Sequence, residues 1–325
     1  MARLERETVD VIIPVYHPDK KLYKLLELLS SQTVLPKKVY LLNTETGRQE
    51  DATETLQKNI QSFFSKKKKF GEIQPLLIEI VPIKKKEFDH GGTRHKGAML
   101  SDSPFLLFMT QDAVPAGEEL IEELLRPMGQ GADVAYARQL ARLHAGVLET
   151  YTRIFNYPEK SQTRTKTDIE KLGIKAFFCS NVCAMYRRAA YMELDGFPRR
   201  AIFNEDMVFA SKVLQSGGLV AYCAEAKVYH SHNYTWGEQF HRNFDLGVSQ
   251  ADNPQVFKKV RSEREGIRFV TETLRFLWNQ HYYIEIIDFF GETVFKYAGY
   301  LLGKNHRLLP KELILRCTMN QSYWE

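Results

Sequence analysis

The sequence has few cysteines, no long hydrophobic run and no strong net charge, and each of these absences excludes a class of protein. Only four of the 325 residues are cysteines, and none forms the Cys-x-x-Cys pair of a zinc knuckle or redox centre. No apolar run reaches the roughly 18 residues that a membrane-spanning helix needs. The first ten residues are charged and lack the apolar core of a signal peptide. We therefore expect a cytoplasmic protein with reduced cysteines.

The charge balance also limits the partners. The formal net charge is +5, and charged residues make up 26% of the chain. This charge is compatible with phosphates or an anionic membrane surface, but it is too small and too dispersed to indicate nucleic-acid binding. The hydrophobic content of 44% is sufficient for one large domain with a smaller addition.

The first half of the chain alternates strand and helix patterns. This order predicts an α/β fold with a parallel sheet covered by helices on both faces, and ligands beyond the carboxyl ends of the strands. Strands are predicted at residues 9–15, 38–42, 76–82 and 104–109, and helices after Asp19, at 51–64 and at 93–100.

The second half is less regular. Residues 157–173 are polar, which predicts a mobile loop that can close over a substrate. From about residue 250 the sequence becomes helical and rich in aromatic residues, so we expect two regions, 1–250 and 251–325. Short helices are predicted at 187–194 and 207–215, and short strands at 220–223 and 227–230.

Two carboxylate motifs are candidates for chemistry. Asp112, which ends the Thr-Gln-Asp sequence after a buried strand, can bind a divalent cation that bridges to a diphosphate, although turns favour Asp in any case. Glu205 and Asp206 stand side by side at a predicted helix start. They can cap the helix, or their mutual repulsion can raise one pKa and create a general base.

Two further motifs offer nitrogen ligands and phosphate contacts. His230 and His232 close a predicted strand, where residues i and i+2 face the same side and can reach one metal ion, although surface histidines near a turn are the alternative. Gly91 and Gly92 open a helix before Arg94. Glycines let the backbone approach a phosphate, and the arginine adds a charged contact, whereas an ordinary strand-to-helix turn is the alternative.

These motifs, in this order, resemble the family 2 glycosyltransferases with a GT-A fold, and within them the bacterial polysaccharide rhamnosyltransferases. The resemblance covers about residues 8–250. It rests on the segments VDVIIPVYHP (9–18), FDHGGTRHKG (88–97), FMTQDAVP (108–115), FFCSNVCAMYRRAAYMELDGF (177–197), FNEDMVF (203–209) and VYHSHNYT (228–235).

The resemblance implies a role for most of these residues. The residues implied to bind the nucleotide sugar are Pro14, Val15, Tyr16, Asn43, Gly91, Gly92, Arg94, Gln111 and Asp112. Asn43 stands where many relatives have an Asp that reads the pyrimidine. Asp112 would bind Mg²⁺ or Mn²⁺ with help from His230 or His232, because Thr110 replaces the first Asp of the usual Asp-x-Asp.

The same resemblance implies an inverting transfer. Asp206 would take a proton from the acceptor hydroxyl, and Glu205 would bind hydroxyls beside it. The subfamily suggests dTDP-L-rhamnose as the donor and a glycan or polyprenyl-linked acceptor at the inner face of the cell membrane. The C-terminal helices, with Phe289, Phe290 and Lys296 among their aromatic and basic residues, would lie on that membrane, or pack on the catalytic domain or on a second subunit of a homodimer.

Two rival functions remain from the sequence. A metal-dependent phosphohydrolase would use Asp112, Glu205, Asp206, His230 and His232 as ligands, but it leaves the Pro-Val-Tyr and Gly-Gly-Thr-Arg segments without a role. A non-catalytic sugar-nucleotide-binding subunit would explain the missing first Asp. The intact Glu-Asp and His-x-His motifs favour an enzyme.

Overall fold

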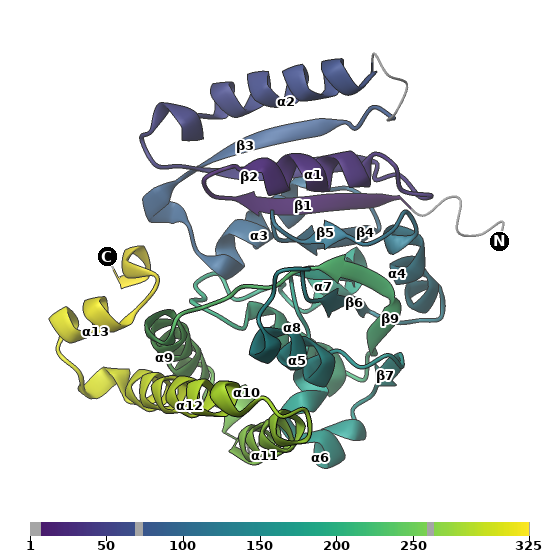
Figure 1. Ribbon diagram of the computed structural model, residues 1–325. Helices are drawn as coiled ribbons and strands as arrows, with labels where there is room; N and C mark the ends of the chain where they lie inside the picture. The colour runs from purple at the N-terminus through teal and green to yellow at the C-terminus, as the bar shows by residue number, and fades with distance from the viewer. Residues whose placement is uncertain (1–7, 69–73, 259–262, 325) are drawn as a thin grey trace.

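A mixed nine-stranded sheet forms the centre of the described residues, which are 8–68, 74–258 and 263–324 of a computed structural model (Figure 1). The strands follow the spatial order β3-β2-β1-β4-β8-β6-β9-β5, and β7 pairs with β9. They are β1 (Val9–Val15), β2 (Lys38–Glu45), β3 (Ile78–Lys84), β4 (Phe105–Met109), β5 (Val114–Pro115), β6 (Val134–Leu140), β7 (Gln162–Arg164), β8 (Cys183–Arg187) and β9 (Val220–Tyr229).

The predicted α/β architecture with a mostly parallel sheet is confirmed. Strand β1 runs parallel to β2 and β4, and β2 runs parallel to β3. Strand β8 is antiparallel to both of its neighbours, β4 and β6, while β6 and β9 are parallel to each other. The carboxyl ends of β4 and β9 therefore lie at the same edge of the sheet, although two strands separate them.

Apolar layers cover both faces of the sheet. Alternate residues of β1 point to opposite sides, so that Val11 and Ile13 belong to one cluster and Ile12 to the other. Helix α1 (Lys20–Leu29) begins after Asp19, whose side chain accepts a hydrogen bond from the Lys21 amide as the sequence predicts. The other helices of this part are α2 (Thr53–Lys68), α3 (His90–Leu100), α4 (Leu120–Gly129), α5 (Val147–Asn156), α6 (Asp168–Leu172), α7 (Arg188–Glu193) and α8 (Glu205–Gln215).

Two predictions for the second half are wrong. Residues 157–173 contain β7 and α6, and Arg164 of β7 is buried, where it donates to the Phe178 carbonyl at 2.8 Å and to the Tyr136 hydroxyl at 2.7 Å. The two short strands predicted at 220–223 and 227–230 are one strand, β9, with a register shift opposite Ala137 and Arg138. In both cases pairing with distant strands supplies the order that the local pattern lacks.

The described residues from Trp236 onward are mainly helical. Helices α9 and α12 approach closely at Gly299 and Gly303 of α12. The missing side chains allow this approach, since a Cβ atom at these positions would overlap the backbone of Phe240 or Phe244. None of the described helices is long and apolar enough to cross a membrane. The helices are α9 (Trp236–Asp252), α10 (Pro254–Phe257), α11 (Glu263–Asn279), α12 (Tyr283–Lys304) and α13 (Lys311–Cys317).

Candidate active site

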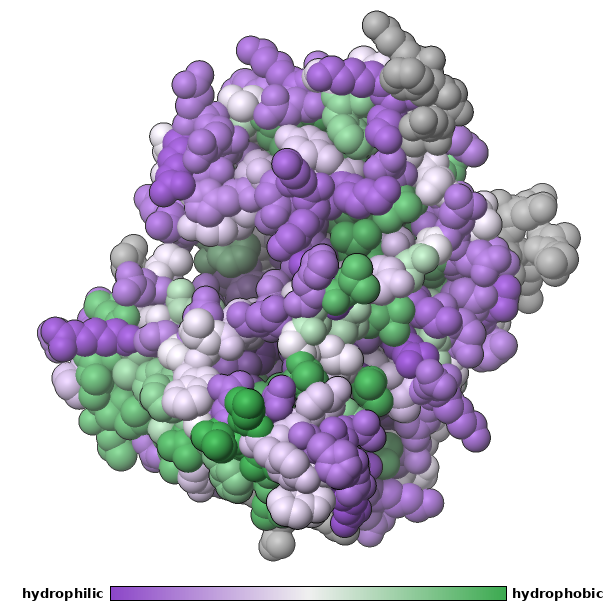
Figure 2. Space-filling model, in the orientation of Figure 1, coloured by the Kyte–Doolittle hydropathy of each residue, from purple (hydrophilic) through white to green (hydrophobic). Residues whose placement is uncertain are grey.

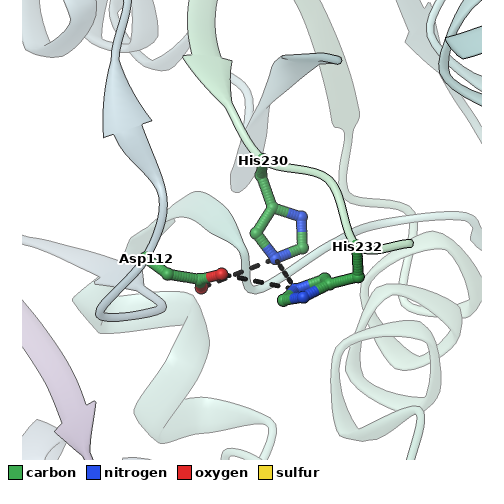
Figure 3. A group of neighbouring side chains, drawn as sticks. All are labelled: Asp112, His230 and His232. Atoms are coloured by element: carbon green, nitrogen blue, oxygen red, sulfur yellow. Dashed lines mark hydrogen bonds and ion pairs between the residues drawn. The ribbon is translucent and has the colours of Figure 1, made fainter. Parts of the chain in front are cut away.

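The structure brings Asp112, His230 and His232 together at the carboxyl edge of the sheet. Asp112 follows β4, and the two histidines follow β9 (Figure 3). The Nε2 atom of His230 lies 3.6 Å from Asp112 Oδ1, and that of His232 lies 3.3 Å from Asp112 Oδ2. The two Nε2 atoms are 3.1 Å apart. As the i, i+2 spacing predicts, both imidazoles point to the same side.

This cluster fits a divalent metal ion. One ligand atom from each of the three residues lies within 4.8 Å of the others. Among the described residues, Asp112 Oδ2 is buried without a hydrogen-bond partner, and the guanidinium of Arg142, 3.5 Å away, offsets part of the cost of burying it. The carboxylate suits Mg²⁺ or Mn²⁺, whereas the two imidazoles favour a transition-metal ion, so of these two ions the donor set fits Mn²⁺ better.

The protonation states also suit metal ligands. Burial lowers the pKa of His230 to about 3, and it lowers that of His232 as well. Burial alone would raise the pKa of Asp112, but His230, His232 and Arg142 hold it below its usual value. At neutral pH the two imidazoles are therefore neutral and the carboxylate is ionised, as metal coordination requires.

Arg142 forms hydrogen bonds with both segments that carry the candidate ligands, at Asp112 and at Ser231. Its guanidinium donates to the Asp112 carbonyl, and Nη2 lies 3.5 Å from Asp112 Oδ2. Its amide donates to the hydroxyl of Ser231, the residue between the two histidines, at 3.0 Å. The segment after β6 thus connects the loops that carry the three candidate ligands.

A second group of buried charges surrounds Glu205 at the start of α8. Asn204, directly before it, has a left-handed backbone with φ of 60°, which Asn tolerates better than most residues. The Glu205 carboxylate lies 3.1 Å from Arg94 Nη1 and accepts a 3.0 Å hydrogen bond from Asn181 Nδ2. Burial would raise the pKa of Glu205, but Arg94 and His90 lower it, so Glu205 is ionised.

Asp206, beside Glu205, has the opposite shift. Burial and the charge of Glu205 raise the pKa of Asp206 to about 7. Its two oxygens accept hydrogen bonds from the backbone amides of Asn181 at 2.9 Å and Met207 at 2.8 Å, which fix the orientation of the carboxylate. A carboxylate with a pKa near neutrality is suited to general base catalysis.

The end of β1 is tied to the residue before Asp112. The Tyr16 amide donates to Gln111 Oε1, and Gln111 Nε2 donates to the Tyr16 carbonyl, both at 2.8 Å. The Tyr16 ring is 44% exposed at this edge, whereas the Val15 side chain is buried in the core. Of the residues at the end of β1 that we expect to bind nucleotide, Tyr16 is the one with a side chain available for stacking.

The structure gives Asn43 a local partner. Its side chain is fully buried and donates to the Asp51 carbonyl at 2.8 Å. The Asp51 carboxylate lies 2.8 Å from Nδ1 of His17, whose side chain is 38% exposed. A contact between Asn43 and the base stays a prediction, because this side chain reaches no surface in the described structure.

The Gly-Gly-Thr-Arg segment has a clear packing role. The amides of Gly91 and Gly92 donate to the capping carboxylate of Asp89 at 3.0 and 2.7 Å. A Cβ atom at either glycine would overlap the backbone of Pro198 or Arg199. Arg94 is only 4% exposed, since it faces Glu205. Contacts of these residues with a diphosphate stay predictions.

Several residues of the site escaped the sequence analysis. Asn181, which contacts both Glu205 and Asp206, lies within the segment 177–197 that carries part of the family resemblance, and this was the available signal. Gln139 and Arg142 lie at and after the end of β6, where no sequence pattern marks them. They reach the site only because β6 pairs with β9.

The fold is similar to that of solved structures, among them a mannosyltransferase and TarS. A mannosyltransferase of Pyrobaculum calidifontis, solved with GDP-Man and Mn²⁺, matches with a TM-score of 0.60 at 11% identity, over 92% of this chain and 87% of that one. Residues 1–349 of TarS from S. aureus, solved with UDP-GlcNAc, match with a TM-score of 0.52 at 14% identity, over 93% and 91%. The fold is therefore that of GT-A glycosyltransferases.

Sequence relatives narrow this class. The model of the family described as Glycosyl transferase family 2 matches residues 10–195. The O-antigen chain rhamnosyltransferase RfbN of Salmonella typhimurium is 37% identical over 320 residues, covering 97% of this chain and 96% of the relative. The rhamnosyltransferase WbaN of Salmonella anatum is 40% identical over 249 residues, or 75% and 78% of the two chains. The chain belongs to glycosyl transferase family 2 and is a rhamnosyltransferase-like glycosyltransferase.

Proposed function

We propose that this protein is an inverting, metal-dependent transferase that moves L-rhamnose from dTDP-L-rhamnose onto a lipid-linked polysaccharide acceptor, such as an O-antigen chain. The observation that carries the proposal is the presence of two separate clusters, one suited to a metal ion and one to a general base. The rhamnosyl donor and the O-antigen acceptor rest on the names of the two Salmonella relatives.

The two clusters divide the chemistry between them. A bound Mg²⁺ or Mn²⁺, held by Asp112, His230 and His232, would neutralise charge that develops on the departing diphosphate. Asp206 accepts the proton of the acceptor hydroxyl as that oxygen attacks the anomeric carbon from the opposite face. Glu205 stays ionised beside it and keeps the pKa of Asp206 high enough to accept a proton near pH 7.

Adjacent residues connect the two clusters. Ser180 accepts a hydrogen bond from Gln139 Nε2 at 2.9 Å, and Gln139 contacts His230. Asn181 contacts both Glu205 and Asp206. The neighbouring residues Ser180 and Asn181 thus link the two clusters, which supports a single site. In that site the diphosphate at the metal and the acceptor at Asp206 would lie on opposite sides of the sugar.

Nucleotide-dependent stabilisation tests this function. We expect TDP to raise the melting temperature more than UDP, GDP or CDP, and more with Mn²⁺ than without it, because a ligand at 100 times its Kd adds about 2.7 kcal/mol to the stability of the native state. The Asp112→Ala variant should lose the metal-dependent part of this shift.

Other outcomes separate the rivals. A preference for UDP or GDP would keep the mechanism and discard the rhamnosyl donor. A shift with metal alone and none with any nucleotide would favour the phosphohydrolase. Tight TDP binding with no transfer, unaffected by Asp206→Asn, would favour a non-catalytic subunit.

We also propose that α12 contacts the inner face of the cell membrane, where a lipid-linked acceptor would lie. Figure 2 shows hydrophobic side chains gathered over α12 and α13. Among the charged residues of α12 from Ile284 to Leu301, Asp288 is exposed, and its Oδ1 accepts a 2.7 Å hydrogen bond from Trp236 Nε1; Glu285, Glu292 and Lys296 are half-buried. The apolar members of the exposed face of α12, with exposed fractions from 39% to 81%, are Ile284, Ile287, Phe290, Val294, Tyr297 and Leu301.

The surroundings of this face match a lipid surface. Tyr282, Tyr283 and Trp278 are exposed at one end, and such residues favour the level of the lipid headgroups. Lys304 and Lys311 follow the other end, where they can approach anionic headgroups, whereas Arg307 pairs with Asp252 at 2.9 Å. Phe289 and Lys296 do not contribute, since Phe289 is buried and Lys296 pairs with Glu292.

Vesicle sedimentation tests this contact. We expect the protein to sediment with vesicles of phosphatidylglycerol and phosphatidylethanolamine, and the Ile284→Glu, Ile287→Glu double variant to stay in the supernatant. Leu77→Glu, at another exposed apolar residue, should behave like the wild type. A wild-type protein that ignores vesicles and is a dimer, which the double variant dissociates, would instead assign this face to a second copy.

A further inference from the structure

We propose that α5 positions the metal site: Arg153 fixes the side chain of Gln139, and Gln139 in turn fixes His230 in the tautomer that presents its Nε2 lone pair to the metal. The inference rests on the proposed metal site and assigns a function to residues outside the ligand set. Gln139 is the last residue but one of β6, and Arg153 lies on α5.

The orientation of the Gln139 amide follows from Arg153. Arg153 Nη1 lies 2.6 Å from the side-chain atom assigned as Gln139 Oε1, and a guanidinium can only donate hydrogen bonds. The atom facing Arg153 must therefore be the oxygen. The opposite atom, Nε2, faces the hydroxyls of Tyr157 at 2.5 Å and Ser180 at 2.9 Å, which can accept.

The tautomer of His230 follows from this orientation. His230 Nδ1 lies 3.0 Å from the same Gln139 Oε1, so Nδ1 must carry the proton and donate it. The neutral ring then has its lone pair on Nε2, which is the atom that points to Asp112 and His232. A hydrogen bond from the remote ring nitrogen orients a metal-ligating histidine and raises its basicity.

Arg153 also contributes to the position of His232. Its Nε and Nη2 atoms donate to Glu149 Oε1, one turn earlier on α5, at 2.8 and 2.6 Å. The same Glu149 oxygen accepts a 3.3 Å hydrogen bond from the His232 amide. One guanidinium thus supports the imidazole of His230 through Gln139, and the backbone of His232 through Glu149.

Aromatic contacts hold α5 from its other side. The ring of Tyr151 stacks on Phe276 of α11 with centroids 4.3 Å apart, and Phe155 meets Phe269 of the same helix at 5.0 Å. The C-terminal helices therefore support the metal site through α5.

A measurement of Mn²⁺ binding tests the proposal without any turnover. The loss of the electron paramagnetic resonance signal of free Mn²⁺ reports the bound fraction. We expect Gln139→Leu to weaken Mn²⁺ binding by roughly 10- to 100-fold. Gln139→Glu, which keeps an acceptor at the same place, should retain most of the wild-type affinity. Arg153→Met should weaken binding to an intermediate extent.

Gln32→Leu is the matched control. Gln32 is also buried, and its side-chain nitrogen also donates to two oxygens. Its oxygen accepts a hydrogen bond from the Ile121 amide, so Gln32 joins α1 to the start of α4, away from the metal site. We expect this variant to lose thermal stability comparably to Gln139→Leu and to bind Mn²⁺ like the wild type.

Each outcome is decisive. A folded Gln139→Leu protein with wild-type Mn²⁺ affinity would overturn the positioning role, and so would an equal loss of affinity in Gln32→Leu. If Gln139→Leu fails to fold, unchanged Mn²⁺ affinity in Arg153→Met overturns the proposal and weakened affinity supports it. A wild-type protein that does not bind Mn²⁺ would instead overturn the proposed metal site itself.

Discussion

Replacing Asp206 with Asn is expected to lower kcat by roughly 10²- to 10⁴-fold while the protein stays folded and still binds nucleotide. The amide cannot accept the proton of the acceptor hydroxyl, but it occupies the same space beside Glu205. The pKa of Asp206 is raised to about 7, so the base is ionised above that pH and protonated below it. The wild-type rate should therefore rise with pH through about 7, and this rise should be absent from the residual rate of the variant.

Initial rates across a pH series, with circular dichroism as a check of folding, measure this effect. Asp245→Asn is a suitable control, because Asp245 is another buried carboxyl, whose pKa burial raises to about 6, and it bonds to Thr318 in the C-terminal part. That variant should keep the wild-type kcat and pH profile. Full activity in Asp206→Asn would remove Asp206 from the mechanism and reopen the choice of base.

Arg94→Met is expected to lower the free energy of unfolding by about 3–5 kcal/mol, because it leaves the Glu205 carboxylate buried without its cationic partner. Denaturant unfolding followed by circular dichroism measures this loss. Adding Glu205→Gln to Arg94→Met should restore much of the stability, because the uncompensated charge is then gone.

The exposed pair formed by Arg199 and Asp195 is the control for this prediction. Both side chains are mostly exposed, at 61% and 70%, so Arg199→Met should change stability very little. If Arg94→Met is as mild as Arg199→Met, the buried ion pair does not hold the start of α8. The contact of Arg94 with a diphosphate would then become its main role.

Much of the fold could be predicted from local sequence. The β-branched run at residues 9–15 is buried on both faces and forms β1 with the predicted bounds, and Asp19 caps α1 as its position indicates. The antiparallel strand β8, the strand β6 and the short β7 were not predicted. These strands depend on partners far away in the chain, so their own pattern carries little of the signal.

The sequence by itself indicated the candidate residues for chemistry and determined where each lies on its element. Asp112 follows a buried strand, His230 and His232 share one side of an extended segment, and Glu205 and Asp206 open a helix. These are local properties, since they follow from periodicity and from the residue types at the ends of strands and helices.

Only the tertiary structure decided which of these residues meet and in what protonation state. Strand β5, which follows Asp112, pairs with the end of β9, and this pairing brings Asp112 to the histidines. An ion pair between α3 and the start of α8 joins Arg94 to Glu205. Burial then lowers the pKa of His230 and raises that of Asp206. Such contacts join residues far apart in the chain, and burial is a property of the packed fold, so no local pattern in the sequence can report either of them.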